Sequence, residues 1–551
     1  IRGNAMKIKI FKASVAAIAA ICCIAGTASV GVTAAEIDES ELVSYNLDNS
    51  EDNTTPSESE LPESYSSKDL GFVTSVKKQP YNDCWAFAGL AALESKLLKS
   101  GYNIESMSES HLNAWATTRS NNKGWIRNYT GDGYGTTALG YFTSWQGGVF
   151  ESDAGQIDIT KVEHGDDVAT DLAKYGVTGI EYLSKDNPEE IKRAIMEDGG
   201  VYSAYAHAPA CLSDDRTAYY MPSAYISGYT GHAIEVVGWD DNYSVDNFKT
   251  PLNIKPKNPG AWLIKNSWGN NNSLGGYFWM SYEDKFIFAT KYRPSYSIKS
   301  VQPINDNTKL YQNEIDGATY EFSYINSDSV TYLNKFDFSD GYNTLDKVIF
   351  KSESLNSDYS IYYVPTDNGT PTANTDDWTK LYSGSVDYKG YICADIDDYT
   401  LPEGSGSIAV TIDSSNADNN ANASIGVCEW LKNTSSKNYV FINDSKYGDS
   451  YIYYNNTMTD AMEWYKTNND DELGGTFVIK AVTTKPETPL IGDVDLNGVV
   501  DIRDTTAIQK YIANIVQLDE KAMLNADFNA DGRVDITDAT AIQQYLAKNN
   551  D

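Results

Sequence analysis

The chain has few cysteines, few histidines and few basic residues for its length. Its 551 residues include 6 Cys and 4 His, with 43 Lys or Arg against 77 Asp or Glu, for a net charge of −34. This charge excludes nucleic acid as a partner, because phosphate binding needs a basic surface. The shortage of cysteine excludes a disulfide-rich scaffold. The length predicts two to four domains, each with its own core.

Long apolar runs are also absent beyond one stretch near the N-terminus. Residues 13–25 are apolar, follow three lysines and precede small residues that end at Ala35. This pattern predicts a signal peptide over residues 1–35 and a secreted, extracellular protein. A membrane anchor is the alternative, but the run is short for spanning a bilayer. Cleavage would remove Cys22 and Cys23.

Four cysteines then remain, Cys84, Cys211, Cys393 and Cys428. Cys393 and Cys428 fall in one β-rich region. A disulfide and two separate thiols are both compatible with the sequence there, since sequence gives no geometry.

The composition and the hydrophobic pattern of the chain change at several points, and these changes predict its domain organisation. Residues 36–60 are acidic and polar, as in a linker or short propeptide. Residues 61–295 mix helical and strand patterns, and residues 300–482 alternate apolar and polar positions between Asn-, Asp- and Gly-rich turns. A Pro/Thr linker over residues 483–490 leads to residues 491–551, which contain an internal duplication. We therefore predict an α+β domain, an all-β sandwich domain and a small α-helical domain.

The same patterns predict individual elements. Helices are expected over residues 84–100, 108–115, 136–145 and 188–197. Strands are expected over residues 233–238, 261–265, 277–282, 347–350, 359–364, 407–412 and 476–481.

The C-terminal duplication contains two loops with the ligand spacing of a calcium site. Each loop carries oxygen ligands at positions 1, 3, 5, 9 and 12, a backbone carbonyl at position 7 and a glycine at position 6 for the sharp turn. The predicted metal ligands are Asp493, Asp495, Asn497, Val499, Asp501 and Asp504 in the first loop, and Asp527, Asn529, Asp531, Arg533, Asp535 and Asp538 in the second. Asp replaces the usual Glu at position 12 in both loops. An acidic solvated tail is the alternative, but it does not account for two matched copies.

This duplicated segment resembles a type I-like dockerin. The resemblance implies two calcium ions that couple to folding and docking to a cohesin domain of a scaffoldin in a cellulosome-type complex. Each loop is followed by a predicted helix, over residues 505–513 and 539–547. The resemblance places recognition residues late in each loop and on the helix: Ile502, Arg503, Ile536, Thr537, Gln509, Lys510, Gln543 and Gln544.

Chemistry is concentrated in three motifs of residues 61–295. Cys84 opens an apolar helix, where the positive end of the helix dipole favours a thiolate. His232 lies about 148 residues downstream, in the range expected for the partner of a catalytic cysteine. Asn266 follows in the sequence Asn-Ser-Trp-Gly. A buried core thiol is the alternative interpretation of a lone cysteine in an apolar helix.

The three motifs together resemble the papain family of cysteine peptidases. The resemblance implies that Cys84 is the nucleophile, His232 the general base and acid, and Asn266 the residue that orients the imidazole. It also makes Gln79 a donor of the oxyanion hole and Trp268 a shield over the Asn–His bond. An imidazolium at the helix N-terminus would then lower the thiol pKa. Catalysis of this type needs no cofactor.

Three features depart from the family pattern. Gln79 lies five residues before Cys84 rather than six, so one residue of the loop is missing. Asp83 is expected to cap the helix, yet its charge opposes formation of a thiolate. The cysteine that normally forms a structural disulfide just before the nucleophile is absent. Gly133 is expected to line the cleft.

The other histidines are expected to be structural. His111 and His164 are interpreted as packing or loop residues. His207 lies near Cys211, but two such residues are too few for a structural zinc site.

Residues 300–482 resemble the lectin-like domain that follows the protease in some bacterial surface enzymes of this family. Two interpretations stay open for this segment, glycan binding and a packing or spacing module.

Together these patterns predict a secreted cysteine endopeptidase that acts on proteins or peptides and is anchored by a dockerin to a cohesin. Two alternatives remain: a catalytically inactive papain-like binding module, and a carbohydrate-binding protein in which the middle domain dominates.

Overall fold

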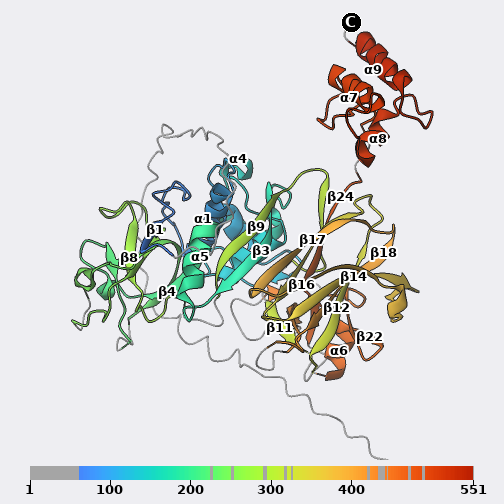
Figure 1. Cartoon of the computed structure of the whole chain (residues 1–551). Coiled ribbons are helices and arrows are strands. Elements are labelled where there is room, and N and C mark those ends of the chain that lie inside the picture. The colour runs from blue at the N-terminus through green and yellow to red at the C-terminus, as the bar shows by residue number, and fades with distance from the viewer. Residues whose placement is uncertain are drawn as a thin grey trace, which may run out of the picture. The chain divides into compact units, whose positions relative to one another are not determined.

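The computed structural model (Figure 1) describes residues 61–223, 228–249, 253–288, 294–315, 319–323, 327–417, 422–431, 441–443, 445–468, 473–486 and 490–549. The predicted signal peptide and the acidic segment 36–60 lie outside these residues, as does part of the predicted linker 483–490. The chain divides into two compact units, Ile1–Thr484 and Lys485–Asp551. A search of the described helices finds none with the length and apolar character needed to cross a membrane.

The helices of the first unit lie mostly in its N-terminal part. They are α1 (Cys84–Lys99), α2 (Glu109–Trp115), α3 (Gly135–Thr143), α4 (Glu151–Ala154) and α5 (Pro188–Asp198), with α6 (Ala461–Asn468) further along the chain. The four predicted helices are confirmed, with ends within two residues of the prediction.

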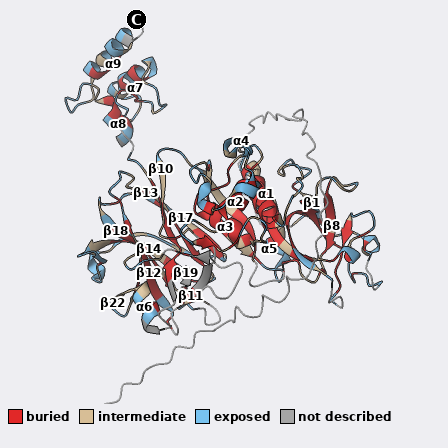
Figure 2. Cartoon of the chain, turned by 180° about the vertical axis from the view of Figure 1, so that it is seen from behind, coloured by how far each residue is buried: buried red, intermediate tan, exposed pale blue. Residues whose placement is uncertain are grey.

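Helix α1 lies in the core rather than on the surface. Trp85, Leu90, Leu93 and Leu97 are each at most 1% exposed, and the helix is drawn almost wholly in the buried colour in Figure 2. A helix that is apolar on nearly all sides must be buried. Its first residue, Cys84, is therefore held at a well-anchored helix end.

Strands of the N-terminal part, apart from β2, which pairs with Phe441–Ile442, form a sheet beside α1. They are β1 (Ser64–Ser66), β2 (Gly124–Trp125), β3 (Tyr175–Leu183), β4 (Val201–His207), β5 (Ala218–Tyr219), β6 (Thr230–Asp240), β7 (Ala261–Lys265), β8 (Tyr277–Ser281) and β9 (Ser295–Pro303). The three predicted strands of this part correspond to β6, β7 and β8. Antiparallel pairing of β6 with β7 and of β7 with β8 carries the His232 and Asn266 segments side by side.

The following part is all β apart from α6. Its strands are β10 (Thr308–Tyr311), β11 (Thr319–Ser323), β12 (Ser329–Asp337), β13 (Thr344–Ser352), β14 (Asp358–Asp367), β15 (Thr370–Pro371), β16 (Thr379–Ser385), β17 (Gly390–Thr400), β18 (Ser405–Asp413), β19 (Ser424–Leu431), β20 (Phe441–Ile442), β21 (Ser450–Tyr454), β22 (Thr457–Asp460), β23 (Leu473–Phe477) and β24 (Ile479–Thr484). A sheet in the order β15-β14-β18-β12-β21-β22 faces the strands β10-β24-β13-β17. Their inner faces share one core, so the predicted β-sandwich is confirmed.

One predicted strand of this part is wrong. Residues 476–481 do not form a single strand, because β23 ends at Phe477 and β24 begins at Ile479. The chain changes partners there: β23 pairs with β19, and β24 pairs with β13. Val478 links the two, donating its N–H to Gly426 and accepting from Lys351 N–H.

The sandwich and the N-terminal part are joined by a continuous sheet. Among the described strands, β17 of the sandwich pairs with β3 through Gly390↔Glu181 and Tyr391↔Ile180, which makes a twelve-stranded sheet. Tyr391 and Val482 also belong to the hydrophobic core that surrounds α1. The two parts therefore form one packed body rather than two globules on a linker.

The second unit contains α7 (Ile502–Ile512), α8 (Glu520–Ala526) and α9 (Ile536–Asn549) around a small core of Val494, Ile508, Ala526, Ala539 and Ile542. Helices α7 and α9 begin three residues before the predicted starts. Asp501 causes this for α7, because it accepts a hydrogen bond from Arg503 N–H and forms a capping box with Asp504. Helix α8, between the two loops, was not predicted.

Candidate active site

Cys84 is the first residue of α1, as the sequence predicts. It lies deep in the protein, but its side chain remains partly exposed. Asp83 occupies the N-cap position with its backbone, yet its side chain makes no cap hydrogen bond. Its carboxylate instead accepts from Tyr81 N–H at 3.3 Å. The expected capping role of the Asp83 side chain is therefore wrong, because this carboxylate turns back toward the preceding loop.

His232 on β6 and Asn266 at the end of β7 are in direct contact. His232 Nε2 lies 2.9 Å from Asn266 Oδ1, and the same oxygen accepts from Ser267 N–H at 2.8 Å. An amide oxygen that accepts from the ring assigns the proton to Nε2, which leaves Nδ1 as the basic nitrogen. The Trp268 ring stacks on His232, with centroids 4.6 Å apart and planes at 24°. This placement covers the His–Asn contact, as expected from the sequence.

The cysteine and histidine motifs meet through one backbone group. Ala233 N–H donates to Cys84 Sγ at 3.4 Å across 149 residues of sequence. Ala233 directly follows His232, so the sulfur lies next to the backbone that carries the imidazole. The N-terminal end of α1 and strand β6 are thus joined at the Cys84 sulfur.

Gln79 is held next to the same segment despite its shortened loop. Its N–H donates to Ser267 O at 2.8 Å, and its Oε1 accepts from Ser267 Oγ at 2.6 Å. Its Nε2 donates to Tyr81 O at 2.8 Å. Lys78 pairs with Trp268 in an isolated β-bridge. The loop that lacks one residue is therefore anchored on both sides of Gln79.

The pKa values differ from those that the helix dipole alone predicts. Burial, Asp132 and Asp83 raise the pKa of the Cys84 thiol to about 11, although the Ala233 N–H lowers it. Burial lowers the pKa of His232 to about 4. The expected lowering of the thiol pKa is therefore wrong for this state of the site, because loss of hydration outweighs the helix end. These directions favour a thiol and a neutral imidazole as the resting pair at neutral pH.

His207 lies closer to the site than the sequence indicates. Its ring packs edge-on against Trp268 at 4.8 Å and lies 6.4 Å from the His232 ring, while Nδ1 is 3.1 Å from Tyr205 OH. Strand β4 brings it there by pairing with β6, in the register Tyr205↔His232. The alternative zinc site with Cys211 gains no support, since the cluster with metal-ligand geometry among the described residues lies in the C-terminal unit.

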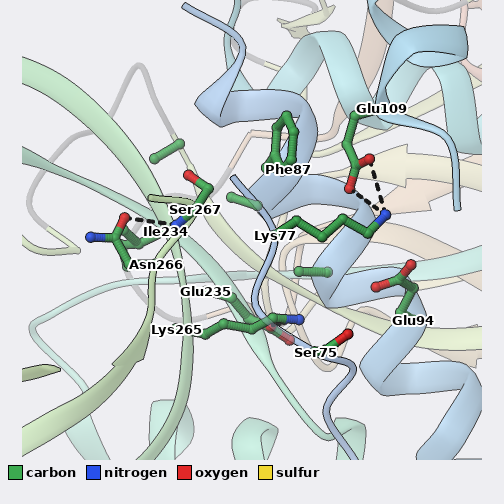
Figure 3. Close-up of a pocket in the computed structure, with 13 residues that line it drawn as sticks. Ser75, Lys77, Phe87, Glu94, Glu109, Ile234, Glu235, Lys265, Asn266 and Ser267 are labelled. Carbon is green, nitrogen blue, oxygen red and sulfur yellow. Dashed lines mark hydrogen bonds and ion pairs between the residues drawn. The ribbon is translucent and has the colours of Figure 1, made fainter. Parts of the chain in front are cut away.

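A charged cluster lies beneath the site around a cavity of about 20 Å³, which has room for one water. Figure 3 shows Lys77 pointing at Glu109, with Glu94 of α1 and the Glu235–Lys265 pair close by. Lys77 Nζ is 2.8 Å from Glu109 Oε1, and Lys265 Nζ is 3.4 Å from Glu235 Oε2. Burial raises the pKa of Glu109 to about 7, despite the opposing effect of Lys77. This cluster was not predicted from the sequence, although Glu94 within the mostly apolar helix α1 was a signal for it.

The first loop of the C-terminal unit has the geometry of a cation site. Ligand oxygens of Asp493, Asp495 and Asp504 lie within 4.8 Å of one another, and Asp493 and Asp504 are buried. Asp493 also accepts from Gly498 N–H at 2.9 Å, which closes the turn at the glycine. Buried carboxylates this close repel one another unless a cation lies among them. The donor set therefore fits Ca²⁺.

The second loop repeats this arrangement. Asp527 accepts from Gly532 N–H at 2.8 Å, and the fully buried Asp538 accepts from Asn529 and Asp535 N–H at 3.1 and 2.9 Å. These contacts match those of the first loop position by position. The second loop therefore repeats these backbone contacts, with an amide at position 3 and a carboxylate at position 5 where the first loop has the reverse, and the group of three carboxylates with ligand geometry among the described residues lies in the first loop.

Four of the predicted recognition residues, Ile502, Arg503, Ile536 and Thr537, lie at the starts of α7 and α9, while Gln509, Lys510, Gln543 and Gln544 lie further along these helices. Ile502 and Ile536 are 59% and 55% exposed, which is unusual for isoleucine and typical of a docking surface. Arg503 Nη2 is 2.6 Å from Asp501 Oδ2, and Thr537 Oγ1 bonds the equivalent aspartate of the second loop at 2.6 Å. The two starts are therefore chemically similar apart from the arginine.

Comparison with known proteins matches three parts of the chain. The model of the papain family cysteine protease matches residues 61–298, that of the lectin like domain residues 310–483, and that of the dockerin type I domain residues 491–547.

Two solved structures share most of the first unit. The clostridial cysteine protease Cwp84 after propeptide cleavage is 36% identical, with 77% of this chain and 99% of that chain covered and a TM-score of 0.67. The cysteine protease and lectin-like domains of Cwp84, a surface layer associated protein of Clostridium difficile, are 35% identical over 77% and 89% of the two chains, also with a TM-score of 0.67.

Among curated relatives, cathepsin K of Mus musculus is 27% identical over 226 residues, which are 40% of this chain and 60% of cathepsin K. The chain thus spans about 60% of the length of this relative.

A cysteine at the start of a buried helix, faced by a His–Asn pair on adjacent strands, defines the cysteine protease class. The chain belongs to the papain family of cysteine proteases, and it also carries a lectin-like domain and a type I dockerin domain.

Proposed function

We propose that this protein is a secreted endopeptidase that hydrolyses peptide bonds through Cys84, His232, Asn266 and Gln79. Its peptidase domain covers residues 61–295, its lectin-like domain residues 300–482 and its dockerin residues 491–551. Strand β9 begins at residue 295, where the proposed peptidase domain ends, and continues past it. The signal peptide and the acidic linker, or short propeptide, precede residue 61.

In this mechanism His232 Nδ1 takes the proton of the Cys84 thiol as the sulfur attacks the scissile carbonyl. Asn266 holds the ring by accepting from Nε2. The imidazolium then protonates the leaving amine, which departs and leaves an acyl-enzyme. Water activated by Nδ1 hydrolyses this thioester and restores the thiol. Because the resting pair is neutral, proton transfer accompanies attack instead of preceding it.

Two donors stabilise the oxyanion of the tetrahedral intermediate, the backbone N–H of Cys84 and the side-chain amide of Gln79. The amide of Gln79 has two N–H bonds, and one of them is already used by Tyr81 O. Ser267 orients the amide by donating to its oxygen. One oriented donor of this kind contributes about 3 kcal/mol to the transition state.

The single observation that carries the proposal is the hydrogen bond from Ala233 N–H to Cys84 Sγ, because it brings the sulfur to the histidine motif. The test is hydrolysis of a fluorogenic peptide by the full chain, with mass-spectrometric mapping of an epoxysuccinyl inhibitor. We expect labelling at Cys84 and loss of hydrolysis in Cys84→Ala. Cys393→Ala, which removes a thiol from the sandwich, serves as the control. A folded wild-type chain that is neither labelled nor active would exclude the enzymatic proposal and leave the inactive binding module.

The dockerin is proposed to tether the enzyme to a cohesin of a cellulosome-type complex outside the cell. Two calcium ions would be held by the twelve ligands predicted from the sequence, with the backbone carbonyls of Val499 and Arg533 at position 7. The exposed Ile502 and Ile536 support a docking role. Binding to a panel of cohesins in calcium, and its loss in chelator, tests the tether. Absence of binding to every cohesin in calcium would contradict it.

The lectin-like domain is proposed to act mainly as a packing module. Its strand β17 extends the protease sheet at β3, and Gln312 Nε2 donates to Ser144 O at 2.9 Å across the same boundary. Glycan retention is the remaining alternative. A glycan array with the full chain separates the two, since specific retention would favour the sugar-binding role.

A further inference from the structure

A loop of residues 128–133 lies beside the nucleophile without a covalent tie, and we expect it to form the cleft wall, since Gly133 packs on Trp85 and the charge of Asp132 acts on Cys84. This loop contains no cysteine, and Cys84 is free. It leads directly into α3. A loop that must keep its place beside a reactive atom needs anchoring, since ordering a loop costs conformational entropy.

Arg127 provides this anchoring through every N–H of its guanidinium group. Nε donates to Asp132 O at 3.2 Å, and one terminal nitrogen donates to Asn113 O and Ala116 O at 3.2 and 3.1 Å. The other terminal nitrogen donates to Asn113 Oδ1 at 2.8 Å and Gly131 O at 2.6 Å. A guanidinium carries five N–H donors in a planar fork. All five are used here, two of them on the loop and three on the segment of α2.

The same guanidinium lies over the side chain that follows the nucleophile. Arg127 Cζ is 5.0 Å from the centroid of the Trp85 ring, which is a favourable cation–π geometry. Gly133 approaches the same ring so closely that a Cβ there would lie 2.5 Å from Trp85 Cε2. The loop therefore reaches its position only while the Trp85 ring and the guanidinium keep theirs.

The residue before the nucleophile is part of the same network. Asp83 is 3% exposed. Burial raises its pKa, while the charge of Arg127 and a hydrogen bond with Asn113 oppose that rise. On the outer side of the network, the Tyr129 ring contacts Tyr81 edge-on at 5.6 Å. Asp83 and Trp85, the residues on either side of Cys84, are thus both connected to loop 128–133 through the Arg127 guanidinium.

We propose that Arg127 is a positioning residue that holds loop 128–133 against Asp83 and Trp85, the two neighbours of Cys84, and so forms the cleft wall without a disulfide. This inference rests on the proposed peptidase function. Arg127 makes no hydrogen bond to the Cys84 sulfur, so its main effect is on the binding of the peptide part of a ligand, and the thiol responds only through the position of Asp132, whose charge raises the Cys84 pKa.

The test separates binding from reactivity in the full chain. An epoxysuccinyl-leucyl peptide gives KI and kinact at Cys84 by mass spectrometry, and iodoacetamide reports the thiol without using the cleft wall. For Arg127→Ala we expect KI to rise at least about tenfold, because the wall is misplaced, while kinact changes far less. Arg127→Lys keeps the charge and three donors, so it should restore part of the affinity.

Arg119→Ala is the matched control. Arg119 lies in the same segment and over another tryptophan, Trp115, at 5.9 Å, but its guanidinium donates to Gln146 Oε1 at 3.3 Å. We expect its KI to stay within about twofold of the wild type, as for changes remote from the cleft wall.

A wild-type KI in folded Arg127→Ala would overturn the inference, since a role confined to stability lowers the melting temperature and leaves KI unchanged. An equal rise of KI in Arg119→Ala would also overturn it. If Arg127→Ala does not fold, Arg127→Lys decides: an intermediate KI supports the inference, and a wild-type KI refutes it. Lack of epoxide labelling in the wild type would instead refute the proposed function.

Discussion

The peptidase site and the calcium loops are built in opposite ways. Cys84, His232 and Asn266 come from a helix end and two strands separated by long stretches of chain, and they meet only through contacts such as Ala233 N–H to Cys84 Sγ. Each calcium loop draws all of its ligands from twelve consecutive residues. The first site depends on the packing of a whole domain, and the second depends on local chain geometry and a cation.

The peptidase site and the calcium loops also differ in the charge of their side chains. Burial in the peptidase site raises the pKa of the Cys84 thiol and lowers that of His232, which favours the uncharged form of both groups. The calcium loops gather carboxylates whose repulsion only a cation offsets. We therefore expect the peptidase site to be formed before a ligand binds, and the dockerin loops to become ordered as a cation binds.

The largest expected effect is the loss of one site's activity while the other site keeps its own. Cys84→Ala should lower peptide hydrolysis about 10⁴-fold or more and leave calcium binding by the dockerin unchanged. Asp493→Ala combined with Asp527→Ala should abolish calcium-induced ordering and keep kcat/KM. Calorimetric calcium titration and peptide hydrolysis measure the two properties. Loss of both properties in either variant would mean that the two sites are coupled.

The next effect concerns the cluster beneath the peptidase site. Glu235→Ala leaves the buried Lys265 without its carboxylate partner, which is 3.4 Å away, and should cost about 3–5 kcal/mol of unfolding free energy. Denaturant unfolding of the full chain measures this. Asp158→Ala, at the exposed pair with Lys161, should leave the midpoint unchanged. Equal effects of the two variants would contradict the importance of burial.

Removal of the orienting amide should affect catalysis alone. Asn266→Ala frees the His232 ring and should lower kcat about 10²-fold, because a displaced base is poorly aligned for proton transfer. The unfolding midpoint should change little by comparison. Asn270→Ala, four residues further on and exposed, is the control. A fall of KM in place of kcat would indicate another role for Asn266.

The pH profile of kcat/KM should be broad. Activity needs one proton shared by Cys84 and His232. Below about pH 4 the imidazole is protonated and no base is available, because burial lowers its pKa to about 4. Above about pH 11 the thiol loses its proton while the imidazole stays neutral, so the leaving amine has no acid. We expect a plateau from about pH 5 to 10. An acid limb near the ordinary histidine pKa would contradict the buried, neutral pair.

The smallest effect concerns charge near the thiol. Asp132 raises the pKa of Cys84, so Asp132→Asn should lower that pKa and speed alkylation by iodoacetamide at pH 8 about threefold in low salt. Because Asp132 is partly exposed, high salt should shrink the difference. Asp153→Asn is the control. An unchanged rate at low salt would show that burial alone sets the thiol pKa.

Local signals predicted much of the fold. The apolar run after Cys84 and the Asn187–Pro188 start of α5 indicate helices without any tertiary information, since caps and periodicity act over a few residues. The predicted strand over residues 476–481 was wrong because its ends are set by long-range pairing. Its change of partner at Val478 depends on β13 and β19, which lie far away in the sequence.

The residues of the candidate site also divide into those that local motifs predicted and those that only tertiary contacts bring there. Cys84, His232, Asn266 and Gln79 were predicted from motifs, and their catalytic roles stay predictions until activity is measured. His207 and Arg127 were not assigned to the site. Pairing of β4 with β6 brings His207 to Trp268. Backbone carbonyls of the α2 segment and of loop 128–133 surround the guanidinium of Arg127. No motif encodes either placement.

The sequence by itself determined the order of the three domains, the residues of the catalytic motifs and the ligand pattern of the calcium loops, because each is written in residue types at short spacing. Only the tertiary structure decided that burial raises the thiol pKa, that the Arg127 guanidinium is surrounded by backbone carbonyls, and that β17 joins the protease sheet. Burial, hydration and strand pairing act through space, and distance along the chain does not report them.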